Sequence, residues 1–177
     1  SFAPASDQAP TLQAGRSQTV PIDLIDTRAF AAGSRVTVSG SLSRSAGYGS
    51  TLQFYAVLDQ AGAIRDPITG QILQPGHPGY RQAALSAANL VTAAGSNLSA
   101  PNLEVLPFAF SVSGGQLFAP VLTVHDTGGV FFSFGAANLD RVSHFTGYGP
   151  NRYGIEDLAG GGDADFDDLI VRFNLSV

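Results

Sequence analysis

Six of the fourteen acidic residues of the chain lie between positions 156 and 168. They are Glu156, Asp157, Asp163, Asp165, Asp167 and Asp168, in the segment GIEDLAGGGDADFDDLIVRF at residues 154–173. Apolar alternation on both sides of the segment predicts two strands, so the chain reverses between them and the carboxylates converge at one edge of the fold. Two carboxylates about 5 Å apart repel by roughly 3 kcal/mol at an effective dielectric near 20. The segment therefore predicts that a positive charge binds here.

The arginines of the chain do not supply that charge. All nine basic residues are arginine, scattered singly along the sequence. Only Arg152 and Arg172 lie near the acidic segment, and the alternation of the last strand turns Arg172 away from the core face. Ca²⁺ fits better, because it takes roughly six to eight oxygen ligands from carboxylates and carbonyls, and the glycines at 160–162 let carbonyls turn inward. Mg²⁺ keeps more of its waters, and transition metals favour His or Cys, whereas the chain has no Cys and three dispersed His. We therefore expect Ca²⁺ as the cofactor.

Two known calcium-binding loops do not match this segment. Asp163, Asp165 and Asp167 resemble the start of an EF-hand loop, but Asp168 stands where that loop needs Gly and Asn174 where it needs Glu. The glycine-rich RTX repeat fails because the three glycines run straight into Asp163 and nothing repeats. The alternative to a metal site is a solvated acidic turn. Phe166 within the run and the apolar strands around it favour an anchored loop instead.

Strand patterns dominate the rest of the chain. Short apolar or alternating segments lie at residues 35–42, 52–59, 106–115, 117–124, 130–136, 143–149, 152–157 and 169–177. Residues 80–95 are the one predicted helix, Ala-rich and followed by a stop at Gly95. This pattern predicts a mainly β fold, an antiparallel β-sandwich of jelly-roll or immunoglobulin-like type with one short inserted helix. Residues 1–20 are predicted to be an extended lead-in and residues 21–177 a single sandwich domain that carries the calcium-binding loop.

Composition excludes several classes of function. The formal net charge is -5 and no basic patch occurs, which argues against nucleic-acid binding. No apolar run reaches the ~18 residues of a membrane span, so membrane insertion is not expected. The absence of cysteine excludes disulfides, thiolate metal sites and a cysteine nucleophile.

Three blocks of the chain resemble a bacterial family known as domain of unknown function 4114. The blocks are FYAVLDQAGAIRDPITGQILQPGHPGYRQAAL (54–85), FGAANLDRVSHF (134–145) and GIEDLAGGGDADFDDLIVRF (154–173). The resemblance implies a calcium-binding β-sandwich of secreted or cell-surface bacterial proteins, often adhesin-like, with no established reaction. It assigns the acidic signature to the six acids named above.

The other two blocks of the resemblance contribute further candidates. The middle block adds Asn138 and Asp140 as possible metal ligands, although capping of a turn is an equal alternative for both. It also adds His144 as a residue that could support the ligands from behind. The first block contributes Asp59, at the end of a strand, as another such supporting residue, and Tyr80 at the start of the helix.

These observations predict an extracytoplasmic calcium-binding adhesion or recognition module, secreted or at the cell surface, whose partner is a glycan, a peptide or a surface protein. One alternative is a structural surface or matrix module in which calcium only stabilises the fold. A carboxylate-dependent glycan hydrolase is a third hypothesis. No nucleophile motif such as G-x-S-x-G occurs, so we predict no catalytic residues and no enzyme activity.

Overall fold

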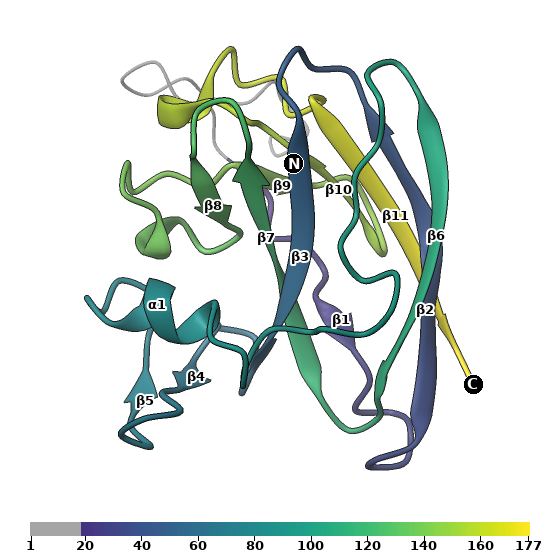
Figure 1. The fold of residues 1–177 in the computed structure, drawn as a ribbon, viewed down its shortest axis with the longest axis vertical. Helices are drawn as coiled ribbons and strands as arrows, with labels where there is room; N and C mark the ends of the chain where they lie inside the picture. Colours follow the sequence, from purple (N-terminus) through teal and green to yellow (C-terminus); the bar gives the residue numbers. More distant parts are fainter. Residues whose placement is uncertain (1–18) are drawn as a thin grey trace, which may run out of the picture.

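The computed structural model describes residues 19–177, so the predicted lead-in lies outside the described residues except for Thr19 and Val20. The fold is mainly β, with two antiparallel sheets that face each other and a small hairpin beside them (Figure 1). This confirms the predicted fold class. None of the described helices is long and apolar enough to cross a membrane.

The larger sheet has five strands in the order β6 (Val105–Ser113), β2 (Arg35–Arg44), β11 (Leu169–Ser176), β10 (Arg152–Ile155) and β9 (Phe145–Gly147). All neighbours in it are antiparallel. The predicted alternation of β11 is observed: Leu169, Val171 and Phe173 are buried, while Arg172 and Asn174 are exposed. As its sequence indicates, β11 is internal to the sheet.

The second sheet is built around β7 (Leu117–Val124), which pairs with β3 (Ser50–Val57) along its whole length. On its other side β7 pairs with β1 (Ile25–Asp26) and with β8 (Val130–Phe132). Seven of the eight residues of β7 are buried, because both faces of this sheet are covered.

Two apolar clusters cover those faces. The first fills the space between the two sheets and includes Leu52, Phe54 and Leu122 from one sheet and Val38 and Val171 from the other. The second cluster lies on the outer face of the β3–β7 sheet. It includes Tyr55, Tyr80 and Phe132, and it is closed by the helix α1 (Tyr80–Ala84) and the hairpin of β4 (Ile64–Arg65) and β5 (Ile72–Leu73).

The predicted helix at 80–95 is much shorter in the structure, where α1 covers Tyr80–Ala84. The carbonyl of Ala83 accepts hydrogen bonds from the Ser86 hydroxyl at 2.7 Å and from the Asn89 side-chain amide at 2.8 Å. These side chains replace the backbone donors that a longer helix would use, so the helix ends here. Residues 85–100 continue as turns that bridge to β3 through Leu90 and Leu98.

Candidate metal centre

The acidic loop connects β10 to β11 at one end of the sandwich (Figure 1). The two strands pair in a register that sets Ile155 opposite Leu169. Glu156 and Asp168 are the next residues beyond this pair, so the reversal of the chain starts with two facing acids. Between them the loop includes the short 3₁₀ turn η2 (Ala159–Gly161).

The structure brings all six acids of the loop together. They form three overlapping groups: Glu156 with Asp157 and Asp168, Glu156 with Asp163 and Asp165, and Asp165 with Asp167 and Asp168. Within each group one oxygen of every carboxylate lies within 4.8 Å of the others. We call the first of these the inner group, because Glu156 is 1% exposed and Asp157 4% exposed.

The inner group contains a buried oxygen with no donor. Asp168 Oδ2 accepts the N–H of Asp157 at 2.9 Å, and Glu156 Oε2 accepts the N–H of Phe166 at 3.2 Å. Asp157 Oδ2, by contrast, is buried and has no hydrogen-bond partner among the described residues. Buried polar atoms in proteins are nearly always paired, so this oxygen lacks the donor or cation that such an atom normally has.

Burial raises the pKa of two carboxyls in the inner group. It raises the pKa of Glu156 to about 8, with hydrogen bonding to Asp168 adding to the effect. Burial also raises the pKa of Asp157 to about 6, again assisted by the charge of Asp168. Without a cation, Glu156 therefore holds a proton at neutral pH, while Asp157 gains one only when the pH falls toward its raised pKa.

The local sequence gives no indication that Arg44 lies beside the loop. It stands opposite Leu169 in the pairing of β2 with β11, and its charge lowers the pKa of Asp157. Its guanidinium, however, donates to the carbonyls of Ala100 at 3.1 Å and Gly47 at 3.3 Å. Within residues 19–177, Arg28 forms an ion pair with Asp26, and His144 Nε2 lies 2.7 Å from Asp140 Oδ2; neither contact involves one of the six acids.

Gly162 gives the loop a conformation that other residues rarely adopt. Its φ is 51° and its ψ is -133°, and a Cβ placed there would overlap the carboxylate of Glu156. Phe166 anchors the other half of the loop, because it is buried and its carbonyl accepts the Tyr148 hydroxyl at 3.1 Å. The loop is therefore shaped around the Glu156 side chain and held to the sheet.

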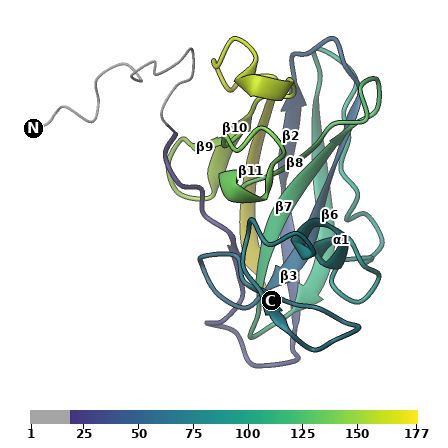
Figure 2. The ribbon, with the colours of Figure 1, turned by 90° about the vertical axis from the view of Figure 1, so that its left-hand side faces the viewer.

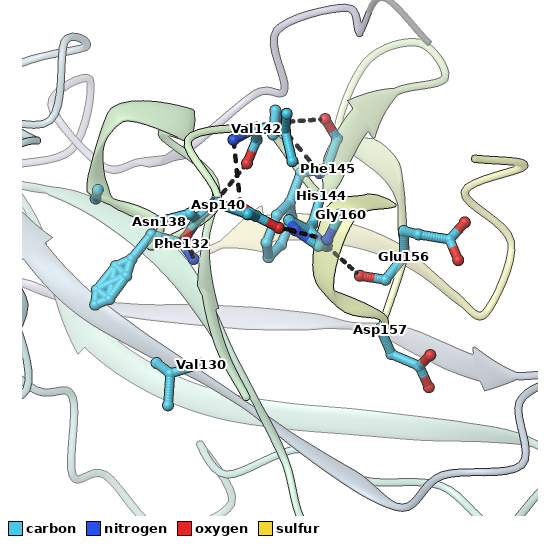
Figure 3. A network of polar contacts seen from close by, with 12 residues as sticks. Val130, Phe132, Asn138, Asp140, Val142, His144, Phe145, Glu156, Asp157 and Gly160 are labelled. Carbon is cyan, nitrogen blue, oxygen red and sulfur yellow. Dashed lines mark hydrogen bonds and ion pairs between the residues drawn. The ribbon is translucent and has the colours of Figure 1, made fainter. Parts of the chain in front are cut away.

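Asp140 supports the loop from the turn before β9. Its Oδ2 accepts the N–H of Gly160 at 2.7 Å and lies 2.7 Å from His144 Nε2 (Figure 3). Burial by itself would raise the pKa of Asp140, but the hydrogen bonds from Gly160, His144 and Val142 outweigh it and hold the pKa below its ordinary value. Asp140 is charged and belongs to none of the three acidic groups.

His144 contacts the backbone at the start of the acidic loop. Its ring is fully buried and stacks on Phe131 with the ring centroids 3.9 Å apart. Its Nδ1 lies 2.9 Å from the carbonyl of Glu156, while its own carbonyl accepts the Glu156 N–H at 2.8 Å. Since both ring nitrogens are engaged, His144 positions the start of the loop and has no nitrogen to offer an ion.

Asn138 is not grouped with the acids, although the sequence left metal ligation open for it. Its Oδ1 accepts the N–H of Phe132 at 2.7 Å, and its amide donates to the carbonyls of Phe132 at 3.0 Å and Val142 at 2.8 Å. These bonds fix the turn around η1 (Gly135–Ala137), so the side chain caps the turn.

Asp59 also lies apart from the acidic loop. It belongs to the connection from β3 to β4, and β4 lies at the opposite end of the sandwich from the acidic loop (Figure 1). Its Oδ1 accepts the N–H groups of Ala61 at 3.0 Å and Ala63 at 3.1 Å. Instead of supporting the acidic loop as predicted, Asp59 caps the β3–β4 turn.

The comparison with protein families gives one finding. Residues 108–176 match a family described as a domain of unknown function (DUF4114). The searches of curated proteins and of solved structures each gave no match. The matched residues include β11, β10 and β9, the turn with Asp140 and His144, and the whole acidic loop. The similarity to the DUF4114 family therefore lies in residues 108–176, the part of the chain that forms the acidic loop and its supports.

Proposed function

We propose that this chain is a calcium-binding recognition module that works outside the cytoplasm. The observation that carries the proposal is Asp157 Oδ2, a buried carboxylate oxygen without a donor, in a side chain grouped within 4.8 Å with oxygens from Glu156 and Asp168. A buried and unpaired carboxylate oxygen costs free energy unless a cation meets it. Ca²⁺ at the inner group would neutralise these carboxylates.

The donor set favours Ca²⁺ over other cations. The side chains that converge on the loop offer only oxygen atoms, and oxygen ligation is typical of Ca²⁺ and Mg²⁺. The neighbouring His144 has both ring nitrogens engaged, so no nitrogen ligand is provided for zinc or copper. Several clustered carboxylates suit Ca²⁺ better than Mg²⁺, which is usually held by one or two carboxylates and keeps its waters.

The proposed place of action follows from the proposed ion. Calcium is abundant outside cells, and sites in extracellular modules are tuned to that abundance. An acidic loop ordered by calcium at the end of a sandwich offers a fixed surface to a partner, as loops on rigid scaffolds commonly do. We therefore propose a secreted or cell-surface protein that recognises a glycan, a peptide or a surface protein.

A calorimetric titration of the purified chain with CaCl₂, after treatment with EDTA, tests the proposal. We expect saturable binding, with MgCl₂ binding at least about tenfold more weakly. With a Kd of about 10 µM, about 1 mM Ca²⁺ would add about 2.7 kcal/mol to the free energy of unfolding. A melting temperature that stays the same in EDTA and in calcium would overturn the proposal.

A structural module is a second candidate, favoured by the edge strand β6. Val105 and Leu106 at the start of β6 are 65% and 36% exposed, Leu103 just before the strand is 79% exposed, and β6 pairs with β2 alone. Exposed apolar side chains on an unpaired edge favour contact with a neighbouring domain. Light scattering after gel filtration tests this: a calcium-dependent dimer that is lost in Val105→Lys would support it, and a monomer at all concentrations would count against it.

A further inference from the structure

A groove of about 630 Å³ opens beside the turn that carries Asp140. Four parts of the chain line it: residues 19–24, the turns at 60–61 and 74–75, and residues in the segment 133–145. The first of these runs beside β9, the strand in which the last one ends (Figure 2), and the N–H of Gly147 in β9 donates to the carbonyl of Val20 at 2.9 Å. The volume falls in the range of small-molecule sites, about 300–1,000 Å³.

The lining of this groove is mostly apolar, carries no charge among the described residues and includes a few polar side chains. None of the described residues that form it is Asp, Glu, Arg or His. The exposed glutamines Gln60 and Gln74 are among its lining residues, and their side-chain amides make no hydrogen bond among residues 19–177. The half-buried ring of Phe134, which packs against Gly62, provides an aromatic surface. Free amides and a ring suit a ligand with hydroxyl groups and C–H faces.

From this lining we propose that the groove binds a neutral oligosaccharide. Each amide offers both a donor and an acceptor to neighbouring hydroxyls of a sugar, and the Phe134 ring offers a face for the C–H side of a pyranose. Acidic sugars are disfavoured, because no described cation lines the groove to pair with them.

A peptide fits the groove less well than a sugar. Extended peptides gain most of their affinity by adding a strand to a free sheet edge. The nearby edge of β9 is already used, since Val20 accepts from Gly147 and its own N–H donates to Thr146 Oγ1 at 2.9 Å. Recognition in the groove has to come from side chains, which favours a sugar.

This inference rests on the proposed recognition function and gives it a ligand class and a place. The groove wall at 133–145 is the segment whose Asp140 and His144 hold the acidic loop (Figure 3). None of the six acids lines the groove, so sugar binding and calcium binding can be measured separately.

The test is a calorimetric titration of the chain in calcium with neutral oligosaccharides of glucose, galactose and mannose. We expect at least one to bind saturably, and Gln60→Ala with Gln74→Ala to lower its affinity by about tenfold. The matched control is Gln71→Ala, an exposed glutamine at the other end of β5 that does not line the groove, which should change the affinity less than about twofold.

Three outcomes would overturn the inference: none of the neutral oligosaccharides binds, the double variant binds as tightly as the parent chain, or a peptide library selects a ligand that competes for Gln60 and Gln74.

Melting temperatures in calcium and in EDTA separate failure of this inference from failure of the proposed ion site. If Ca²⁺ stabilises the chain and no sugar binds, the inference alone is wrong. If a sugar binds through the glutamines and Ca²⁺ has no effect, the ion site alone is wrong.

Discussion

The carboxylate of Asp140 accepts a 2.7 Å hydrogen bond from the main-chain N–H of Gly160, which lies 20 residues later in the chain. The same carboxylate oxygen lies 2.7 Å from His144 Nε2. One oxygen therefore joins the turn before β9 to the acidic loop after β10. The geometry of the loop depends on this side chain even though Asp140 belongs to none of the acidic groups.

Asp140→Asn is expected to weaken both the loop and its ion site. The variant keeps an oxygen for Gly160 but loses the charge that strengthens the hydrogen bonds to Gly160 and His144, so the free energy of unfolding in calcium falls by about 1 to 2 kcal/mol. Urea unfolding in about 1 mM Ca²⁺ measures this loss. Asp126→Asn, at an exposed turn position, is the control and should change little. Equal stability of the two variants would contradict the role given to Asp140.

Asp157→Asn is expected to have opposite effects with and without calcium. In EDTA near neutral pH the variant no longer buries an unpaired carboxylate oxygen, so it melts at or above the temperature of the parent chain. In about 1 mM Ca²⁺ the variant lacks a ligand and gives up most of the roughly 2.7 kcal/mol that the ion would add. Melting temperatures of the variant and the parent chain, measured in EDTA and in calcium, test whether the order of stability reverses. A variant that is less stable by the same amount in both would show that Asp157 has a structural role only.

Gly162→Ala is expected to damage the loop far more than Gly160→Ala. A Cβ at Gly162 overlaps the Glu156 carboxylate, and the φ of 51° with ψ of -133° is strained for any other residue, so we expect a loss of about 2 to 3 kcal/mol. Gly160 has a φ of 78° and ψ of 0°, and a Cβ added there would meet nothing within 4 Å, so Ala should cost about 1 kcal/mol. Urea unfolding and calcium titration of both variants test the ranking. Similar losses in the two would mean that Glu156 is not held by the backbone at Gly162.

The stability of the chain in EDTA is expected to fall as the pH rises from about 4.5 to about 8. The pKa of Glu156 is raised from 4.5 to about 8 and that of Asp157 from 3.8 to about 6 in the folded chain. When folding raises the pKa of a carboxyl, its contribution to the free energy of unfolding is greatest at a pH below the pKa in the unfolded chain. That contribution is lost as the pH rises through the pKa in the folded chain. Urea unfolding at about pH 5, 6.5 and 8 measures the slope, and Glu156→Gln should flatten it.

Calcium should reverse this trend, because the ion binds the carboxylates in their charged form and affinity rises with pH. Binding at neutral pH should release protons, chiefly from Glu156, whose pKa of about 8 keeps it largely protonated before binding. Calorimetry in two buffers of different ionisation enthalpy measures the release. Binding without proton release would place the ion away from Glu156.

Asn138→Ala is expected to destabilise the fold without changing calcium affinity. It removes three hydrogen bonds to the backbone of Phe132 and Val142 and leaves buried groups unpaired, at a cost of about 2 to 4 kcal/mol. Calcium affinity should stay within about twofold under conditions where the variant is folded. Asn97→Ala, which changes an exposed asparagine, is the control. A large loss of calcium affinity in Asn138→Ala would indicate that Asn138 is a calcium ligand.

Local pattern was enough to predict the grouping of the acids. Apolar alternation on both sides of the loop requires a reversal, and the register of Ile155 with Leu169 produces it. The local pattern did not predict that Arg44 lies beside the loop. Its position depends on the pairing of β2 with β11, whose residues are far apart in sequence. The groove was missed for the same reason, since four separate segments line it.

Other differences arise where side chains compete with the backbone. Alanine content predicted a helix over residues 80–95, but Ser86 and Asn89 bond to the Ala83 carbonyl and end it early. For Asn138, the residue type is equally common in turns and in metal sites. Only the folded turn shows which backbone groups its amide meets.

The strand β11 lies between β2 and β10, although it follows both of them in the chain. Before β11 is in place, the β2–β6 pair and the β9–β10 pair share no hydrogen bonds within the large sheet. The seating of β11 therefore joins the two pairs into one sheet, and long-range pairing of this kind forms slowly. Because the acidic loop leads directly into β11, an ion held there would favour the seating of this strand, so calcium would act as a trigger of folding as well as a ligand of the finished fold.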